Sequence, residues 1–150
     1  LPVIENLAFD GLGKFVFSSA AKFETFYRAM SNEEFAIFSK SGKLPEGGEK
    51  FISTQMAYSQ KYIGKPGYDL LVEFNTKEGT LKQLANIGVG DNSKLVIQNG
   101  FGNLPKVFKG WQPTNAFLKG EGSTLNIGLG NGSALSTFNK NIVGFKIVGQ

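Results

Sequence analysis

The apolar and polar positions in the first 90 residues predict strands that are separated by short helices. Segment 25–30 (TFYRAM) is rich in aromatic residues, which is typical of a strand. Segment 49–55 (EKFISTQ) predicts a second strand. The nearly continuous apolar run in segment 68–76 (YDLLVEFNT) predicts the most clearly defined strand of the chain.

A helix is predicted between the first two of these strands. Ser31 is a candidate N-cap, and Glu34 follows it at the spacing of a capping box. Phe35 and Phe38 would share one helix face, and Gly42 is placed to end the helix.

Shorter elements fill the rest of the chain. Short helices are expected in segments 56–64 (MAYSQKYIG) and 77–89 (KEGTLKQLANIGV), and one or two helical turns in segment 133–141 (SALSTFNKN). After residue 90 the pattern predicts short strands between glycines, in segments 94–100 (KLVIQNG), 106–111 (KVFKGW), 115–122 (NAFLKGEG), 123–132 (STLNIGLGNG) and 141–149 (NIVGFKIVG).

This order of elements predicts an α+β fold rather than a doubly wound parallel sheet, because helices and strands are mixed first and strands dominate later. The expected architecture is a single domain with two short helices packed on a mostly antiparallel, split β-sheet. Residues 1–13 (LPVIENLAFDGLG) are interpreted as a leader or linker that ends in a glycine-rich turn, and residues 14–150 as the functional domain.

Composition narrows the chemistry. A chain of 150 residues with 41% hydrophobic residues and 14 phenylalanines is long and apolar enough for one buried core. It contains no cysteine and no histidine, which excludes disulfides, thiol nucleophiles, histidine-dependent triads and the usual zinc sites. No metal site is expected, and no stretch is long and apolar enough to insert into a membrane.

Charge is unevenly distributed. Arg28 is the only arginine among 16 basic residues. Residues 101–150 contain five lysines and a single acidic residue, Glu121, so the whole net charge of +4 lies in the last third of the chain. Such a basic region favours a phosphate-bearing ligand or nucleic acid, and an ordinary lysine-rich surface is the equally weighted alternative.

Three local features have competing interpretations. The glycines of IGLGNG (127–132) lack the G-x-G-x-x-G spacing, so a glycine-rich hairpin turn is favoured over a dinucleotide-binding loop. Trp111 is interpreted as a core or rim residue rather than a stacking platform for a ligand. Glu73 lies within a predicted buried strand, so it either faces water or is an unusual buried charge.

The ordered succession of four segments resembles a known superfamily. FYRAMS carries an arginine after an aromatic residue, a capped helix ending in SGKL follows, FISTQMAYSQKY joins a strand to an aromatic-rich helix, and GYDLLVEFNTKEGTL closes in a glycine turn. Over about residues 23–90 this order resembles the Arg-Ser-Glu branch of the ADP-ribosyltransferase superfamily. The similarity is strongest to the C-terminal toxin domains of bacterial polymorphic toxins of the Rhs, contact-dependent inhibition and insecticidal-complex types.

The resemblance implies an ADP-ribosyltransferase-like fold and transfer of ADP-ribose from NAD, without a metal. Cleavage of the nicotinamide–ribose bond passes through an oxocarbenium-like transition state. In the implied roles, Arg28 holds the pyrophosphate as a bidentate fork, and Ser53 braces the nicotinamide ribose. The residues implied in NAD binding are Tyr27, Arg28, Ala29, Ser53, Thr54, Gln55 and Tyr58. In the alternative interpretation, the hydroxyls of Ser53 and Thr54 cap the following helix.

The superfamily also implies a catalytic glutamate on a late loop, where it usually shows Glu-x-Glu or Gln-x-Glu. Glu121 is the only carboxylate in the last 50 residues, and it is assigned this role. Lys119 stands two residues earlier, where the superfamily places the Gln or Glu that selects and activates the acceptor. This departure leaves the type of acceptor open.

The resemblance implies a toxin that is secreted or delivered into the cytoplasm of a target cell. Its acceptor would be a protein or a structured RNA there, and the basic last third favours RNA. A cognate immunity protein is expected, acidic in character because the toxin is basic. The toxin itself is expected to be monomeric.

Two other functions compete with this interpretation. One is a metal-independent, histidine-free ribonuclease toxin similar to tRNA-cleaving toxins, in which lysines and hydroxyls hold the scissile phosphate. Its candidate residues are Lys109, Lys119, Thr124 and Thr137. The other is a binding domain without catalytic activity.

Overall fold

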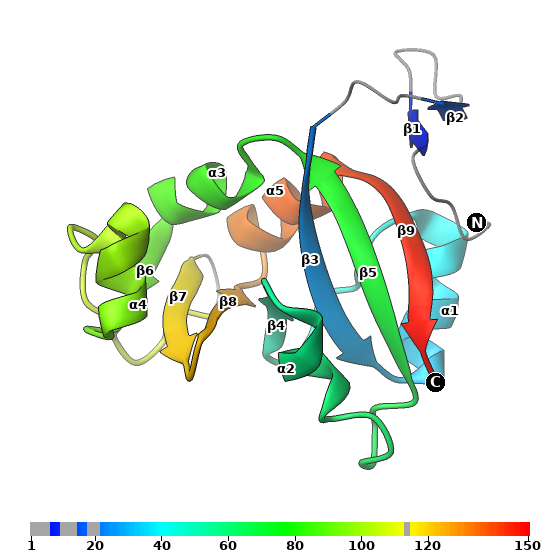
Figure 1. Ribbon diagram of the computed structural model, residues 1–150, viewed down its shortest axis with the longest axis horizontal. Coiled ribbons are helices and arrows are strands. Elements are labelled where there is room, and N and C mark those ends of the chain that lie inside the picture. The colour runs from blue at the N-terminus through cyan, green and yellow to red at the C-terminus, as the bar shows by residue number, and fades with distance from the viewer. Residues whose placement is uncertain (1–6, 10–14, 18–21, 113–114) are drawn as a thin grey trace.

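The computed structural model describes residues 7–9, 15–17, 22–112 and 115–150, and they form an α+β fold (Figure 1). The strands are β1 (Leu7–Phe9), β2 (Phe15–Phe17), β3 (Phe23–Met30), β4 (Lys50–Ser53), β5 (Leu70–Lys77), β6 (Gly88–Gly90), β7 (Ala116–Glu121), β8 (Thr124–Leu129) and β9 (Ile142–Gly149). The helices are α1 (Asn32–Ser41), α2 (Met56–Gln60), α3 (Thr80–Asn86), α4 (Lys94–Val96) with the π-helical turn η1 (Ile97–Phe101), and α5 (Ser133–Asn141). The predicted α+β class is therefore confirmed, whereas the prediction of two helices on the sheet is imprecise, since the described residues contain five α-helices.

Seven strands form one sheet in the order β6-β7-β8-β4-β3-β5-β9. Neighbouring strands are antiparallel except β6 and β7, which are parallel. Strands β3 and β5 are paired over their full length, from Phe23 to Met30. In contrast, β3 and β4 share a single registered pair, Tyr27 with Ser53. The sheet is therefore divided into a β3-β5-β9 half and a β4-β8-β7-β6 half, which diverge from each other in Figure 1.

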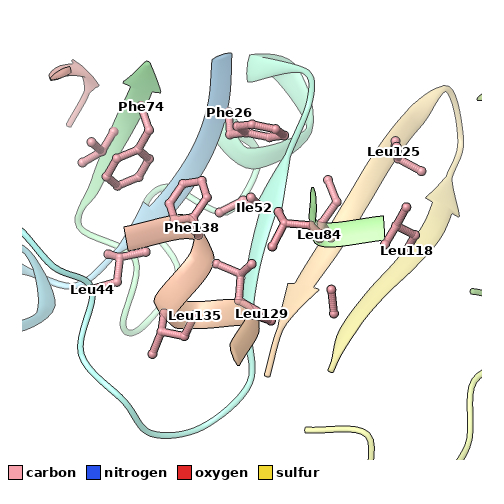
Figure 2. Close-up of a cluster of buried hydrophobic side chains, with 14 of the residues drawn as sticks. Phe26, Leu44, Ile52, Phe74, Leu84, Leu118, Leu125, Leu129, Leu135 and Phe138 are labelled. Carbon is pink, nitrogen blue, oxygen red and sulfur yellow. The ribbon is translucent and has the colours of Figure 1, made fainter. Parts of the chain in front are cut away.

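Aromatic side chains join α1 and α5 to the sheet. Phe138 of α5 packs edge-on against Phe26 of β3 and Phe74 of β5, with ring centroids 5.8 and 5.5 Å apart (Figure 2). Phe38 of α1 lies 5.2 Å from Phe74 and 5.0 Å from Phe145 of β9. These rings are fully buried, so one face of the sheet is the hydrophobic core of the domain.

The ends of α1 follow the predicted signals. The Ser31 hydroxyl accepts a hydrogen bond from the Glu34 backbone N–H at 3.1 Å. Gly42 has φ of 74°, a left-handed conformation that favours glycine, and its N–H donates to the Phe38 carbonyl at 2.7 Å. The strands predicted around residues 25–30, 49–55 and 68–76 correspond to β3, β4 and β5.

Three predictions in the second half of the chain are wrong. Segment 94–100 is helical rather than extended, because the Ser93 hydroxyl caps α4 at the N–H of Val96, whose side chain is buried. Segment 106–111 forms only an isolated bridge from Lys106 to Gly90. Segment 127–132 is no hairpin turn, because β8 leads directly into α5 through Gly132.

β1 lies within the predicted leader and pairs antiparallel with β2, which lies beyond it in the predicted functional domain; the two strands form a separate two-stranded sheet. Residues 1–6 and 10–13 of the predicted leader, and the predicted domain boundary after residue 13, lie outside the described residues. None of the helices in the described part of the chain has the length and apolar character needed to cross a membrane.

Candidate active site

A cavity of about 220 Å³ opens beside the narrow junction between β3 and β4, and we call it the β3–β4 cavity. Because these strands share one registered pair, side chains rather than paired backbone fill the space next to it. The lining residues come from both halves of the sheet and from α2 and its flanking loops: Arg28, Ala29, Glu49, Phe51, Tyr58, Ser59, Tyr62, Tyr68, Lys119 and Asn126. Of the residues predicted to bind NAD, this set contains Arg28, Ala29 and Tyr58.

Three of the N–H groups of the Arg28 guanidinium donate hydrogen bonds within the protein. Its Nε and Nη2 atoms donate to the two carboxylate oxygens of Glu34, at 2.7 and 2.9 Å. Its Nη1 atom donates to the backbone carbonyl of Phe51 in β4, at 3.0 Å. The side chains of Arg28 and Glu34 are only 12% and 15% exposed. An arginine carries five N–H donors, so two remain for a ligand in the cavity.

Lys50 is a second buried cation near this ion pair. It is 4% exposed, and its Nζ atom donates to the Gly47 carbonyl at 2.7 Å. Burial lowers the pKa of Lys50; the charge of Arg28 lowers it further, whereas the carboxylate of Glu34 opposes the shift. Glu34 therefore interacts electrostatically with two cations, of which only Arg28 forms an ion pair with it among the described residues.

Ser53 lies beneath the cavity rather than in its lining. Its side chain is fully buried, and its hydroxyl donates to the Gln55 carbonyl at 2.9 Å and lies 2.7 Å from the Ser59 hydroxyl. Ser59 lines the cavity and donates to the Tyr27 carbonyl at 3.3 Å. The two serines thus link β4, α2 and β3 at the junction. Sequence reasoning missed Ser59, whose only signal is its position six residues after Ser53.

The residues after Ser53 hold β8 in place. The Thr54 hydroxyl donates to the Leu125 carbonyl at 3.2 Å. The side-chain oxygen of Gln55 accepts from the Thr124 hydroxyl at 2.9 Å. The idea that the hydroxyls of Ser53 and Thr54 cap the following helix is wrong, because Gln55 is the N-cap residue of α2 and these hydroxyls donate to carbonyls.

Three tyrosines form one wall of the β3–β4 cavity. The Tyr58 and Tyr62 rings lie 5.8 Å apart and their hydroxyls 3.3 Å apart, and the Tyr68 ring lies 5.3 Å from that of Tyr62. The ammonium of Lys61 lies 4.0 Å from the centre of the Tyr58 ring. Burial raises the pKa of Tyr58, and the hydrogen bond with Tyr62 adds to this shift.

Lys119 and Glu121 lie on the same face of β7. Their side chains form an ion pair of 2.7 Å and are 27% and 38% exposed. Lys119 lines the cavity, and its Nζ atom lies 4.8 Å from the centre of the Phe51 ring. Glu121 is not in the described lining, and it is held at the edge of the cavity by Lys119.

Tyr27 and Glu73 belong to another part of the sheet surface. They are registered partners in β3 and β5, and Lys146 of β9 lies next in the row, 3.6 Å from the Glu73 carboxylate. The Glu73 side chain is 17% exposed, so it is neither freely solvated nor buried alone. Burial raises the pKa of Tyr27, and the neighbouring Glu73 raises it further.

Trp111 is a packing residue, as the sequence predicted. It is 6% exposed, and its ring lies 5.3 Å from that of Phe117 and 6.1 Å from that of Phe51. The amide of Gln112, the next residue, donates to the Glu49 carboxylate at 2.9 Å. This aromatic group supports the cavity wall from behind Phe51.

The four residues considered for a ribonuclease do not gather in one place. Lys119 lines the β3–β4 cavity, whereas Thr124 is buried and donates to the side-chain oxygen of Gln55, which is not in the lining. Lys109 lies on an exposed loop near Trp111, and Thr137 lies on α5. Among the described residues, no cluster of three or more acidic residues is arranged to hold a metal ion.

The comparisons with known proteins agree with the toxin class expected from the sequence. The model of the PT3 toxin domain matches residues 22–147, which include both halves of the sheet and the whole lining of the cavity. No curated protein matches the chain. A match over most of the chain assigns the family, and the protein therefore belongs to the PT3 toxin domain family.

Proposed function

We propose that this toxin domain transfers ADP-ribose from NAD to a macromolecule of the target cell and releases nicotinamide. One observation carries the proposal. Arg28 and Tyr58 line the same cavity, the hydroxyl of Ser53 lies directly beneath it, and Lys119 holds Glu121 at its edge. Residues from β3, β4, α2 and β7 thus lie at or next to the β3–β4 cavity, although 93 positions separate Arg28 from Glu121 along the chain.

The chemistry assigns a task to each of these groups. The bond between C1′ of the ribose and the nicotinamide nitrogen breaks, and its electron pair leaves with nicotinamide. A nucleophilic oxygen or nitrogen of the acceptor then bonds to C1′ and loses its proton. The two remaining N–H donors of Arg28 suit a pyrophosphate oxygen, and the carboxylate of Glu121 suits the positive charge that develops on the ribose.

Glu121 must leave Lys119 for this role. The pair is partly exposed, and exposed ion pairs contribute little free energy, about 0–1 kcal/mol. Separating Glu121 from Lys119 therefore costs little free energy. Lys119 would then be free to contact a phosphate of NAD or of the acceptor.

The size of the cavity suggests how NAD would lie. A volume of about 220 Å³ is below the roughly 300–1,000 Å³ that encloses a drug-sized ligand. We therefore place only one half of the dinucleotide, the nicotinamide and its ribose, against the tyrosine wall. The adenosine half would extend over the surface.

The acceptor is proposed only as a class. Lys119 replaces the acceptor-selecting Gln or Glu of the superfamily, and Lys61 lies at the rim of the tyrosine wall. Both cations favour a polyanionic acceptor, such as structured RNA. A cognate immunity protein with an acidic surface would fit the net charge of +4.

The test is release of free nicotinamide from NAD in the presence of a target-cell lysate. Arg28→Lys keeps the charge but loses the planar fork, and we expect its activity to fall about 100-fold, as for other misplaced binding groups. Lys40→Arg, an exposed change on α1, is the matched control and is expected to retain activity. Because Arg28→Lys also disturbs a buried ion pair, Glu121→Gln provides a second variant at a more exposed position.

The outcomes separate the competing functions. Turnover by Arg28→Lys equal to that of the wild type would refute the role of Arg28. Discrete fragments of total RNA without added NAD would favour the ribonuclease, since ADP-ribosylation leaves the strand intact.

A further inference from the structure

We propose that Glu34 is a positioning residue, which fixes the Arg28 guanidinium so that only one pair of its N–H donors faces the β3–β4 cavity. The inference rests on the proposed function for the identity of the ligand, NAD. The binding step itself is measurable with inorganic pyrophosphate alone, without any turnover.

The contacts leave the guanidinium little freedom. The Glu34 carboxylate occupies the Nε and Nη2 edge with bonds of 2.7 and 2.9 Å. The Phe51 carbonyl holds Nη1 from the other strand, at 3.0 Å. The donors that remain are one N–H on Nη1 and one on Nη2. An anion would therefore be bound by these two N–H groups at the end of the guanidinium, because Glu34 and the Phe51 carbonyl occupy the other three.

The start of α1 fixes Glu34 in turn. Its backbone N–H donates to the Ser31 hydroxyl, and this cap holds the first turn of the helix next to β3. Both carboxylate oxygens of Glu34 are used by Arg28, although the capping-box spacing suggested a bond back to the cap residue. Glu33, one position earlier, is exposed. The pairing is thus a property of Glu34 and not of the acidic first turn in general.

The local charge explains why this carboxylate does not exclude an anion. Glu34 lies near two cations, Arg28 and Lys50; burial is the main cause of the lowered pKa of Lys50, Glu34 opposes this shift, and Arg28 adds to it. The lining adds a third cation, Lys119, and a second carboxylate, Glu49, which accepts a hydrogen bond from Gln112. An incoming phosphate therefore meets cations that offset the charge of Glu34, and an arginine that is already oriented.

The experiment compares Glu34→Gln with Glu33→Gln by calorimetric titration of the full chain with pyrophosphate and with NAD. Glu33→Gln removes a charge from the same helix turn and is expected to bind like the wild type. Glu34→Gln should lower the affinity for both ligands about tenfold. This is the lower end of the loss of affinity seen when a residue that orients a ligand-binding side chain is replaced. In nicotinamide release, KM should rise by the same factor with little change in kcat.

A double-mutant cycle separates positioning from a general effect on folding. If Glu34 acts only through Arg28, Glu34→Gln causes no further loss in the Arg28→Lys background. Additive losses, or unchanged or tighter binding by Glu34→Gln alone, would overturn the inference. So would a wild-type chain that binds neither ligand.

Failure of the proposed function gives a different result. Wild-type binding of pyrophosphate that depends on Glu34, without any release of nicotinamide, would refute ADP-ribosyl transfer and leave the positioning role intact.

Discussion

Gly128 of β8 is expected to tolerate no side chain, although its position within a regular strand would normally accept alanine. A Cβ atom at this residue would lie 2.4 Å from Cη2 and 3.0 Å from Cζ3 of Trp111, and 3.0 Å from Cε1 of Phe51. Non-bonded carbon atoms are normally about 3.5–4.0 Å apart. The indole ring would have to move by more than about 1 Å to restore that separation.

The surroundings of Trp111 oppose this movement. The residue is 6% exposed, and the rings of Phe51 and Phe117 flank it. Overpacking of this kind costs about 1–3 kcal/mol. For a chain of this length, 1 kcal/mol corresponds to about 2–4 °C in Tm, so we expect Gly128→Ala to lower Tm by roughly 2–12 °C. Because Phe51 lines the β3–β4 cavity, ligand binding should weaken as well.

Thermal unfolding followed by circular dichroism measures this change. Gly102→Ala is the matched control, because Gly102 has φ of −66° and its nearest neighbour to a new Cβ is at an ordinary 3.5 Å. Its Tm should be unchanged or slightly raised. Combining Gly128→Ala with Trp111→Phe removes both clashing indole atoms and should cost less than the two single changes together.

The reasoning is refuted if Gly128→Ala unfolds within about 1 °C of the wild type and binds ligand equally well. That result would mean that Trp111 moves aside freely and does not support the cavity wall. Additive losses in the double variant would contradict the specific contact with the indole ring.

Two further predictions concern the cap of α1 and the tyrosine wall. Ser31→Ala removes the acceptor for the Glu34 N–H and should cost about 1 kcal/mol in urea unfolding, whereas Ser133→Ala, at the first residue of α5, should cost clearly less; equal losses would contradict the capping role. The folded state keeps the Tyr58 proton to higher pH than the unfolded state, in which the pKa is 10.0, so the free energy of unfolding should fall as pH rises above about 10. In Tyr58→Phe this decline, followed by urea unfolding at a series of pH values, should be shallower, and an unchanged slope would contradict the pKa shift.

Local signals were sufficient for elements whose ends are encoded in neighbouring residues. Ser31 and Gly42 mark the two ends of α1 through hydrogen bonds within one turn. The apolar run of β5 predicts a buried strand whatever its position in the sheet. The same signals failed at segment 94–100, which the sequence predicted as a strand. Its β-branched residues favour a strand, but the Ser93 cap and the burial of Val96 against the core stabilise a helix there. Segment 127–132 failed because its glycines serve close packing and a strand-to-helix connection rather than a hairpin.

The candidate site shows the same division. The sequence by itself determined the chemistry that is excluded, because a chain without cysteine or histidine has no thiol or imidazole to use. It also singled out Arg28 and Tyr58, which the structure brings into one cavity. Only the tertiary structure decided which residues the site residues contact. Arg28 forms its ion pair with Glu34, and the Ser53 hydroxyl contacts that of Ser59. Hydrogen bonds and ion pairs of side chains depend on distances of a few ångströms across the sheet. Those distances depend on the single registered pair between β3 and β4, which no local pattern in the sequence encodes.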